Sequence, residues 1–220
     1  MPKQPRSAEE IEEVKQQILE ETLALITEHG YEGFSMRKLA LRLHIAAKTI
    51  YNYYDNKDEI YLLVLKRGFD LLHSTLLKSM SGHSDPIDKL RAMKNAYIDF
   101  GVNQSNYYDI MFTLYVPKHN DFVGTPLEHV ATVELKAALR VGALFTDVMK
   151  EIAEIHNTIP KEEARRYFIQ FWTSLHGLVT TYNNDLLGYL SGNPFEDLLI
   201  ISNRLLRTFT PRPVEPLPDI

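Results

Sequence analysis

Cysteine is absent from this 220-residue chain, which excludes disulfide bonds, cysteine-ligated zinc fingers and thiol nucleophiles. No apolar run approaches the roughly 18 residues that a membrane span requires. The N-terminal sequence MPKQPRSAEE has no apolar stretch behind its basic residues, so it does not resemble a secretory signal. These absences predict a cytoplasmic protein without a membrane partner.

The short motifs that mark common enzymes are also missing. The eight histidines show no H-E-x-x-H spacing, and the chain has no G-x-S-x-G, no Walker loop and no G-x-G-x-x-G. We therefore expect no catalytic residue, no metal site and no cofactor. An enzyme is kept only as the weakest alternative.

Apolar residues recur at helical spacing along nearly the whole chain, and no segment shows a strand pattern. Ser7 and Glu10 form a capping box, and Gly30 is expected to end the first helix because glycine adopts a positive φ at little cost. Ser35 and Asn56 are placed as N-caps of two later helices. We predict an all-α fold of about nine helices, in the ranges 8–29, 36–43, 47–53, 57–77, from 86 onward, within 103–112, 125–156, 160–190 and 193–208.

The predicted helices divide the chain into a small N-terminal head and a larger body. We expect the head to occupy residues 1–57 and the body residues 58–210. Four prolines in the last ten residues prevent a helix there, so residues 211–220 are expected to form an extended, mobile tail.

Residues 30–60 predict two short helices joined by a tight turn, which is the pattern of a helix-turn-helix DNA reader. Residues 35–57 hold five basic residues and one acid, although the whole chain carries a net charge of −5. Chance clustering in a short window is the alternative explanation of this charge. The positions expected to face inward are Leu39, Ala40, Leu43, Ile45, Ile50 and Tyr54. The positions able to contact a polyanion are Arg37, Lys38, Arg42, Lys48, Thr49, Tyr51, Asn52, Tyr53 and Lys57.

This segment resembles the TetR family of bacterial transcription regulators over residues 18–64. The resemblance is specific because a dozen positions keep one register: Ile18-Leu19, Gly30-Tyr31, Ser35-Met36-Arg37, Leu39-Ala40, Thr49-Ile50-Tyr51, Tyr53-Tyr54 and Lys57. In the body, Trp172-x-x-x-His176-Gly177 looks like the W-x-x-x-H-G signature of one C-terminal subgroup.

Two positions depart from the family pattern. His44 stands in the turn where the family usually has glycine, and a left-handed His costs about 1 kcal/mol more than Gly. Ala46 stands where the family favours a capping residue such as Ser, and Ala offers no side-chain acceptor to the helix N-terminus. Both departures weaken the head slightly without removing the fold.

The resemblance implies a DNA-binding surface made by the second and third helices. Arg37 resembles a family position that reaches a base edge, where Arg can donate two hydrogen bonds to guanine. Lys57 would add its ammonium to free N–H groups at a helix N-terminus, which makes a phosphate site. Tyr31 and Tyr54 are instead expected in the core. The predicted DNA-binding residues are Ser35, Arg37, Ala47, Lys48, Thr49, Tyr51, Asn52, Tyr53 and Lys57.

The resemblance also implies a homodimer whose last two helices form a four-helix bundle with those of a second copy. Its expected interface residues are Phe168, Phe171, Leu175, Val179, Leu198 and Leu205. The alternative is that these apolar stripes are intramolecular core.

The body is expected to hold a small, mostly apolar ligand, for which core packing of the same side chains is the alternative. The expected ligand-binding residues are Tyr97, Phe100, Tyr108, Met111, Phe112, Phe145, Met149, Trp172 and His176. Together these features predict a ligand-responsive repressor that binds a palindromic operator in double-stranded DNA. A helical dimer without sequence-specific DNA binding is the second alternative.

Overall fold

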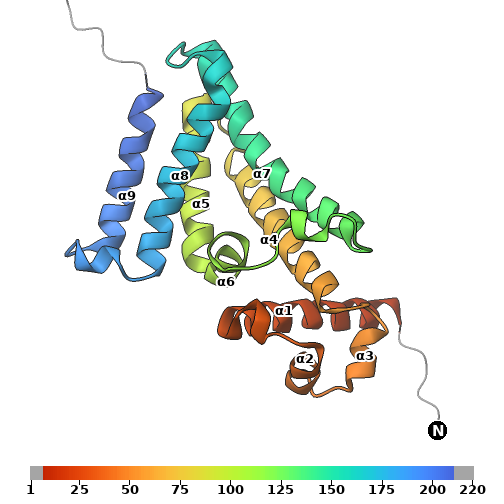
Figure 1. Cartoon of the computed structure of the whole chain (residues 1–220). Coiled ribbons are helices and arrows are strands. Elements are labelled where there is room, and N and C mark those ends of the chain that lie inside the picture. The colour runs from red at the N-terminus through yellow and green to blue at the C-terminus, as the bar shows by residue number, and fades with distance from the viewer. Residues whose placement is uncertain (1–6, 211–220) are drawn as a thin grey trace, which may run out of the picture. The chain divides into compact units, whose positions relative to one another are not determined.

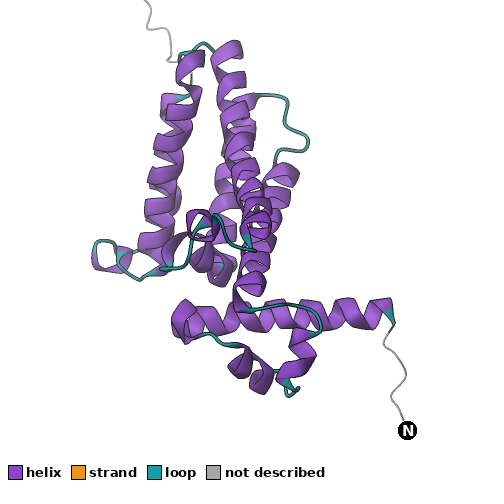
Figure 2. Cartoon of the chain, turned by 45° about the vertical axis from the view of Figure 1, so that its right-hand side comes forward, coloured by secondary structure: helices purple, strands orange, loops and turns teal. Residues whose placement is uncertain are grey.

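The computed structural model describes residues 7–210, and the predicted tail of residues 211–220 lies outside this range. Within the described range the chain forms nine α-helices and no strand, as predicted (Figures 1 and 2). The helices are α1 Ala8–Gly33, α2 Met36–Arg42, α3 Ala47–Tyr51, α4 Lys57–Ser79, α5 Pro86–Asn103, α6 Ser105–Tyr108, α7 Glu128–Ile155, α8 Ala164–Asn183 and α9 Pro194–Leu205.

Backbone contacts divide the chain into two compact units. The N-terminal unit contains the residues up to Leu72 together with Gln104–Leu139, and the C-terminal unit contains His73–Asn103 together with the residues from Arg140 onward. Helices α4 and α7 therefore each contribute residues to both units. The functional division that the sequence suggests at residue 57 stays a prediction.

The capping box and the glycine break that the sequence predicts for the first helix are both present in α1. Ser7 Oγ accepts a hydrogen bond from the N–H of Glu10 at 3.2 Å, and Glu10 Oε2 accepts one from the N–H of Ser7 at 2.7 Å. Gly30 breaks the helical geometry with φ 71° and ψ 167°, a region that is almost exclusive to glycine. One further turn follows the break before α1 ends at Gly33.

Several helix boundaries differ from the prediction by two or more residues, and three of them have a local explanation. Helix α3 ends at Tyr51, two residues early. Helix α7 begins at Glu128 because the Thr125 hydroxyl bonds the Phe122 carbonyl oxygen and forms a local turn before the helix. Helix α8 ends at Asn183 because the chain then takes a positive φ of 57° at Asp185.

The core of the N-terminal unit joins the head to the first half of α4. Four of the six positions predicted to face inward are buried, namely Leu39, Ala40, Ile50 and Tyr54, and Leu43 and Ile45 are half-buried. Tyr31 is buried as predicted, and its hydroxyl donates to Asp58 at 2.5 Å. Tyr61 packs edge-on against Tyr31 with ring centroids 4.9 Å apart. These contacts fix α1 against α4.

Gly68 permits a close approach between α4 and the segment that follows α5. A Cβ atom at this position would lie 2.7 Å from the Met111 Sδ and 2.9 Å from the Tyr107 Cδ1. Both distances are shorter than van der Waals contact, so a side chain at position 68 would require the Met111 and Tyr107 side chains to shift.

The core of the C-terminal unit contains most of the residues predicted to form the dimer surface. Phe171, Leu175, Val179 and Leu198 are almost completely buried within the single chain, while Phe168 and Leu205 are half-buried. The same chain thus covers these four side chains, and their expected role in a dimer interface stays a prediction. Phe168 also stacks on Phe145, with ring centroids 5.6 Å apart. The spacing of apolar residues along a helix shows which face is buried, but not what buries it. In this unit, other helices of the same chain bury that face of α8.

Candidate nucleic-acid interface

The turn between α2 and α3 has the tight geometry of a helix-turn-helix. His44 adopts a left-handed conformation with φ 55°, as the departure from glycine predicts. The N–H of Ile45 donates to the carbonyl oxygen of Ala40 at 3.0 Å, and that of His44 donates to Leu41 at 3.2 Å. Helices α2 and α3 lie on the same side of α1 (Figure 1).

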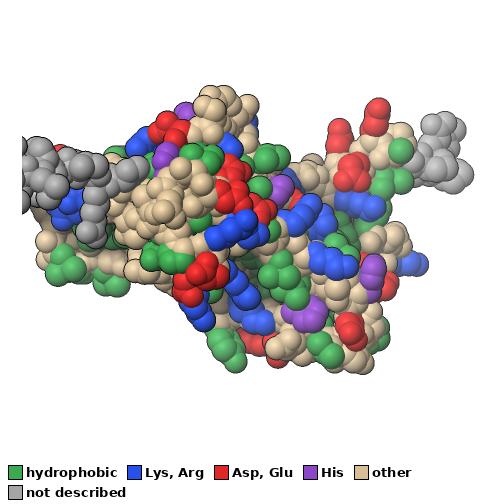
Figure 3. Space-filling model, turned by 90° about the horizontal axis from the view of Figure 1, so that it is seen from above, with side chains coloured by type: hydrophobic (Ala, Val, Ile, Leu, Met, Phe, Trp, Pro, Cys, Tyr) green, Lys and Arg blue, Asp and Glu red, His purple; other side chains and the backbone are tan. Residues whose placement is uncertain are grey.

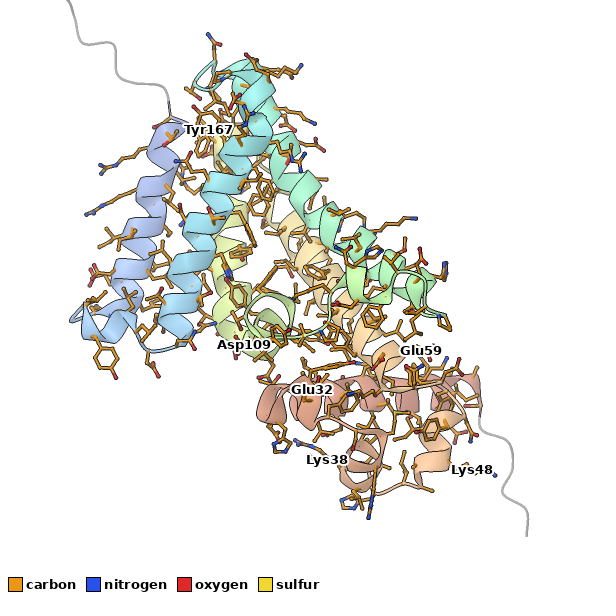
Figure 4. The ribbon with its side chains drawn as sticks, viewed as in Figure 1. Glu32, Lys38, Lys48, Glu59, Asp109 and Tyr167 are labelled. Atoms are coloured by element: carbon orange, nitrogen blue, oxygen red, sulfur yellow. The ribbon has the colours of Figure 1, made fainter. Side chains whose placement is uncertain are left out.

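All nine predicted DNA-binding residues keep some contact with solvent. Arg37, Lys48, Tyr51 and Asn52 are exposed, and Lys48 projects outward from α3 (Figure 4). Tyr51 leaves 53% of its area exposed, so its ring and hydroxyl group are accessible from solvent. Ser35, Ala47, Thr49, Tyr53 and Lys57 are intermediate in exposure.

The two helices of this surface are capped differently. Ser35 Oγ accepts a hydrogen bond from the N–H of Lys38 at 3.3 Å, which caps α2 as predicted. Ala46 gives α3 no side-chain cap, because its methyl group cannot accept a hydrogen bond. The N-terminus of α3 therefore relies on groups other than its own N-cap side chain to satisfy its N–H groups.

Arg42 does not belong to the free basic surface that the sequence suggests. Its guanidinium donates to Glu21 at 2.6 Å and to both carboxylate oxygens of Glu28 at 2.6 and 2.8 Å. The hydrogen bond from Arg42 holds the pKa of Glu28 below its usual range. Arg42 thus fastens α2 to α1, and the positive charge available to a polyanion comes from other side chains.

Lys57 contributes a cation but not the free N–H groups expected beside it. Asn56 Oδ1 already accepts hydrogen bonds from the N–H groups of Asp58 and Glu59, each at 3.0 Å. The Lys57 ammonium lies over the Tyr31 ring, 4.3 Å from its centroid. The aromatic face positions the charge, so a phosphate contact here would be made by the ammonium itself.

Leu41 is a surface residue that the sequence interpretation missed. It leaves 67% of its area exposed on α2, one helical turn after Arg37. Its i, i+4 spacing from Arg37 places both side chains on one face of the helix. This spacing could have predicted that Leu41 is exposed beside Arg37. A leucine within an apolar stretch is, however, usually assigned to the core.

The face of the molecule drawn in Figure 3 carries charges of both signs. Figure 3 shows a face on which Lys and Arg side chains lie among Asp and Glu side chains instead of forming one uniform patch.

No helix in the described part of the chain combines the length and the apolar composition of a membrane span. Among residues 7–210 there is also no cluster of three or more metal-ligating side chains.

The nine predicted ligand-binding residues fall into two groups. Tyr108, Met111 and Phe112 belong to the N-terminal unit, and the other six belong to the C-terminal unit. In the second group, Trp172 Nε1 donates to the Tyr97 hydroxyl at 3.1 Å, and the Trp172 ring stacks on His176. The four-residue spacing of Trp172 and His176 on α8 thus produces a stacked pair. The subgroup assignment based on these residues stays a prediction.

A cavity of about 340 Å³ lies beside Met111 in the N-terminal unit. Its apolar walls include Leu65 and Phe69 of α4 and Ala138 of α7. Glu134 also lines it and is only 7% exposed. Burial raises the pKa of Glu134 to about 7, although Lys118 and His119 act in the opposite direction.

Glu134→Gln is expected to flatten the dependence of stability on pH. Glu134 stays protonated in the folded chain up to about pH 7, whereas it ionises near pH 4.5 when unfolded. The contribution of the Glu134 carboxyl group to the free energy of unfolding is therefore fully present below pH 4.5 and is lost as the pH rises through about 7. At about 1.4 kcal/mol per pKa unit, the variant should gain up to about 3 kcal/mol over the wild type at pH 8.

Urea unfolding at pH 4.5 and pH 8 measures this difference. Glu13→Gln, an exposed change on α1, is the control and should leave the pH profile as it is. Identical profiles for Glu134→Gln and the wild type would contradict the buried, protonated state of this carboxyl group.

Two family models match the chain. The model of bacterial regulatory proteins of the tetR family matches residues 18–64, and the model of the tetracyclin repressor-like C-terminal domain matches residues 90–199.

Individual relatives are similar over parts of their length. The chain is 26% identical over 140 residues to the HTH-type transcriptional activator FasR of Mycolicibacterium smegmatis, covering 64% of this chain and 61% of FasR. It is 37% identical over 62 residues to the HTH-type transcriptional repressor KstR of Rhodococcus jostii, covering 28% of this chain and 29% of KstR. The chain thus matches less than two thirds of the length of either relative.

A solved structure shares the fold. The transcriptional regulator FadR from Bacillus subtilis, in complex with stearoyl-CoA, superposes with a TM-score of 0.65 at 16% identity. The match covers 88% of this chain and 96% of FadR.

Proposed function

Because the chain belongs to the TetR family of bacterial transcription regulators, we propose that it binds a palindromic operator as a homodimer and that a ligand with an apolar chain releases it. Its family consists of DNA-binding regulators and not of enzymes. The observation that supports the operator is the exposed surface of α2 and α3, with Arg37, Lys48 and Tyr51 around a helix-turn-helix turn. The place of action would be the cytoplasm, where the DNA is.

Each part of this surface has its own task in the proposal. Arg37 donates to a guanine edge, and Leu41 lies on the same face of α2, able to meet a thymine methyl group. Lys48 and Thr49, at the N-terminal end of α3, read the neighbouring bases with Ala47. Tyr51, Asn52, Tyr53 and Lys57 contact phosphates, with Lys57 held in place by the Tyr31 ring.

The dimer surface in this proposal is the exposed face of α8 and not its buried stripe. Ile169, Thr173 and Gly177 are exposed and follow one another at four-residue spacing. A Cβ atom at Gly177 would have no neighbour within 4 Å, so this stretch of backbone is open to a partner. Small side chains permit two helices to approach closely across a two-fold axis. Ile200 adds exposed apolar area on α9.

The proposed ligand is a fatty acyl-coenzyme A, the chemical class bound in the FadR structure. The cavity beside Met111 supports an apolar chain, because Leu65, Phe69 and Ala138 line it. Leu65 and Phe69 lie on α4, the helix that begins with Lys57. A ligand that favours one position of α4 therefore shifts the population of DNA-competent heads by its differential affinity.

The relatives include an activator and a repressor. FasR is named an activator and KstR a repressor, and KstR has the higher identity to this chain over the matched residues. We propose repression, in which the chain without ligand occupies the operator.

Stearoyl-CoA is expected to weaken operator binding by about 5- to 150-fold, the usual size of coupling between two sites. Fluorescence anisotropy of a labelled operator measures the release, with coenzyme A alone as the control. Ala138→Phe fills the cavity from α7 and should abolish the response while leaving DNA affinity as it is. Tight binding of stearoyl-CoA without any change in operator affinity would contradict the proposed regulation.

A further inference from the structure

A groove of about 610 Å³ separates α5 from α9 within the C-terminal unit. Its apolar walls are Ile98 and Val102 of α5 and Phe195 and Leu199 of α9. The volume falls within the range of small-molecule sites in proteins, about 300–1,000 Å³. The groove shares no lining residue with the cavity beside Met111.

Lys94 is a buried cation that lines this groove. Only 1% of its area is exposed, and its Nζ donates to the Ser202 hydroxyl at 3.2 Å. Ser202 is itself buried, and its hydroxyl donates to the Leu199 carbonyl oxygen at 2.9 Å. Lys94 forms no ion pair with any carboxylate of residues 7–210.

The neighbouring charged groups do not balance Lys94. Arg91 also lines the groove and pairs with Asp88, one turn earlier on α5. Asp99 accepts a hydrogen bond from the Asn103 amide at 2.7 Å. Burial lowers the pKa of Lys94 to about 8, and Arg91 acts in the same direction. The amine is therefore still mostly protonated at neutral pH.

A buried ammonium without a counter-charge is costly to the fold unless something compensates it. The groove supplies room for such a group. Helices α5 and α9 run antiparallel (Figure 1), so Lys94 and Ser202 meet toward one end of the groove, while Val102 and Phe195 lie toward the other. One end is thus basic, and apolar side chains lie toward the other, although Asp99 and Asn103 also line the groove.

We propose that this groove binds a small amphipathic carboxylate, with its carboxylate on the Lys94 ammonium and its alkyl chain between Ile98 and Leu199. A carboxylate supplies the missing counter-charge and accepts charge-assisted hydrogen bonds. The apolar walls take up an unbranched chain without requiring further polar partners. The site is independent of the operator and of the cavity beside α4.

Calorimetric titration of the purified full chain with decanoate tests this site, with decanol as the uncharged ligand of equal chain length. The wild type is expected to bind decanoate at least about tenfold more tightly than decanol, because only decanoate pairs with Lys94. Lys94→Met should bind the two equally. Lys150→Met, a half-exposed lysine paired with Asp147 on α7, should behave as the wild type does.

Thermal unfolding separates loss of the site from loss of the fold. Because Lys94→Met removes an unbalanced buried charge, its Tm should stay the same or rise. Should this variant fail to fold, Val102→Phe narrows the apolar end and is expected to weaken decanoate and decanol alike. Equal affinity of the wild type for the two ligands would overturn the proposal. Full decanoate binding by folded Lys94→Met, or by Val102→Phe, would do the same.

Discussion

Arg37→Ala is expected to weaken operator binding by about 1–3 kcal/mol in each half-site and to relax base preference at one position. Arg37 is exposed on α2 and forms no ion pair with any described residue, so its guanidinium is available to a base edge. Because the proposed homodimer presents two copies of Arg37, the total loss is expected to reach about 2–6 kcal/mol. Binding to a set of operators with single-base changes, followed by anisotropy, measures both effects.

Lys57→Ala should weaken binding to all of these sequences about equally. Its ammonium lies over the Tyr31 ring at the start of α4, and we propose that it contacts the phosphate backbone there. Removing one phosphate contact should lower the slope of log affinity against log salt by about 1 in each half-site. Lys136→Ala, an exposed change on α7, is the control and should alter neither quantity. Equal loss of base discrimination in Arg37→Ala and Lys57→Ala would contradict their separate tasks.

Gly177→Glu is expected to convert the proposed homodimer into a monomer. The position faces open space in the single chain, and glycine is a poor helix former, so a side chain there should not harm the folded monomer. At a two-fold interface, however, the change places two carboxylates opposite each other on closely packed helices. Operator affinity should fall at least about 100-fold, since a single head makes only half of the phosphate and base contacts.

The mass in solution at micromolar concentration shows whether the dimer has dissociated. Gly192→Glu is a matched control, since its Cβ position is equally open and lies outside α8. A dimeric Gly177→Glu variant with normal operator binding would place the interface elsewhere.

Local geometry of the head followed from the sequence because single residues determine it. Ser7, Ser35 and Asn56 cap their helices with their own side chains, and Gly30 breaks α1 at the expected position. His44 takes the left-handed conformation that its place in the turn requires. In each case the physical cause lies within four residues of its effect.

Partners distant in sequence were not predictable in the same way. Arg42 looked like a free cation because Glu21 and Glu28, which neutralise it, lie on another helix. The apolar stripe of α8 was recognised, but periodicity does not say whether the same chain or a second copy covers it. Lys94 gave no signal, since a lysine is assumed to be exposed until its neighbours are known.

Selection of DNA from a random pool by the purified chain, read by sequencing at moderate salt, tests the central claim most directly. The account predicts enrichment of one palindromic sequence, whose half-sites are separated by about one helical turn of DNA, 34–36 Å, or a multiple of it. Binding that depends on salt but enriches no sequence would contradict it, and would favour a helical dimer without sequence-specific DNA binding.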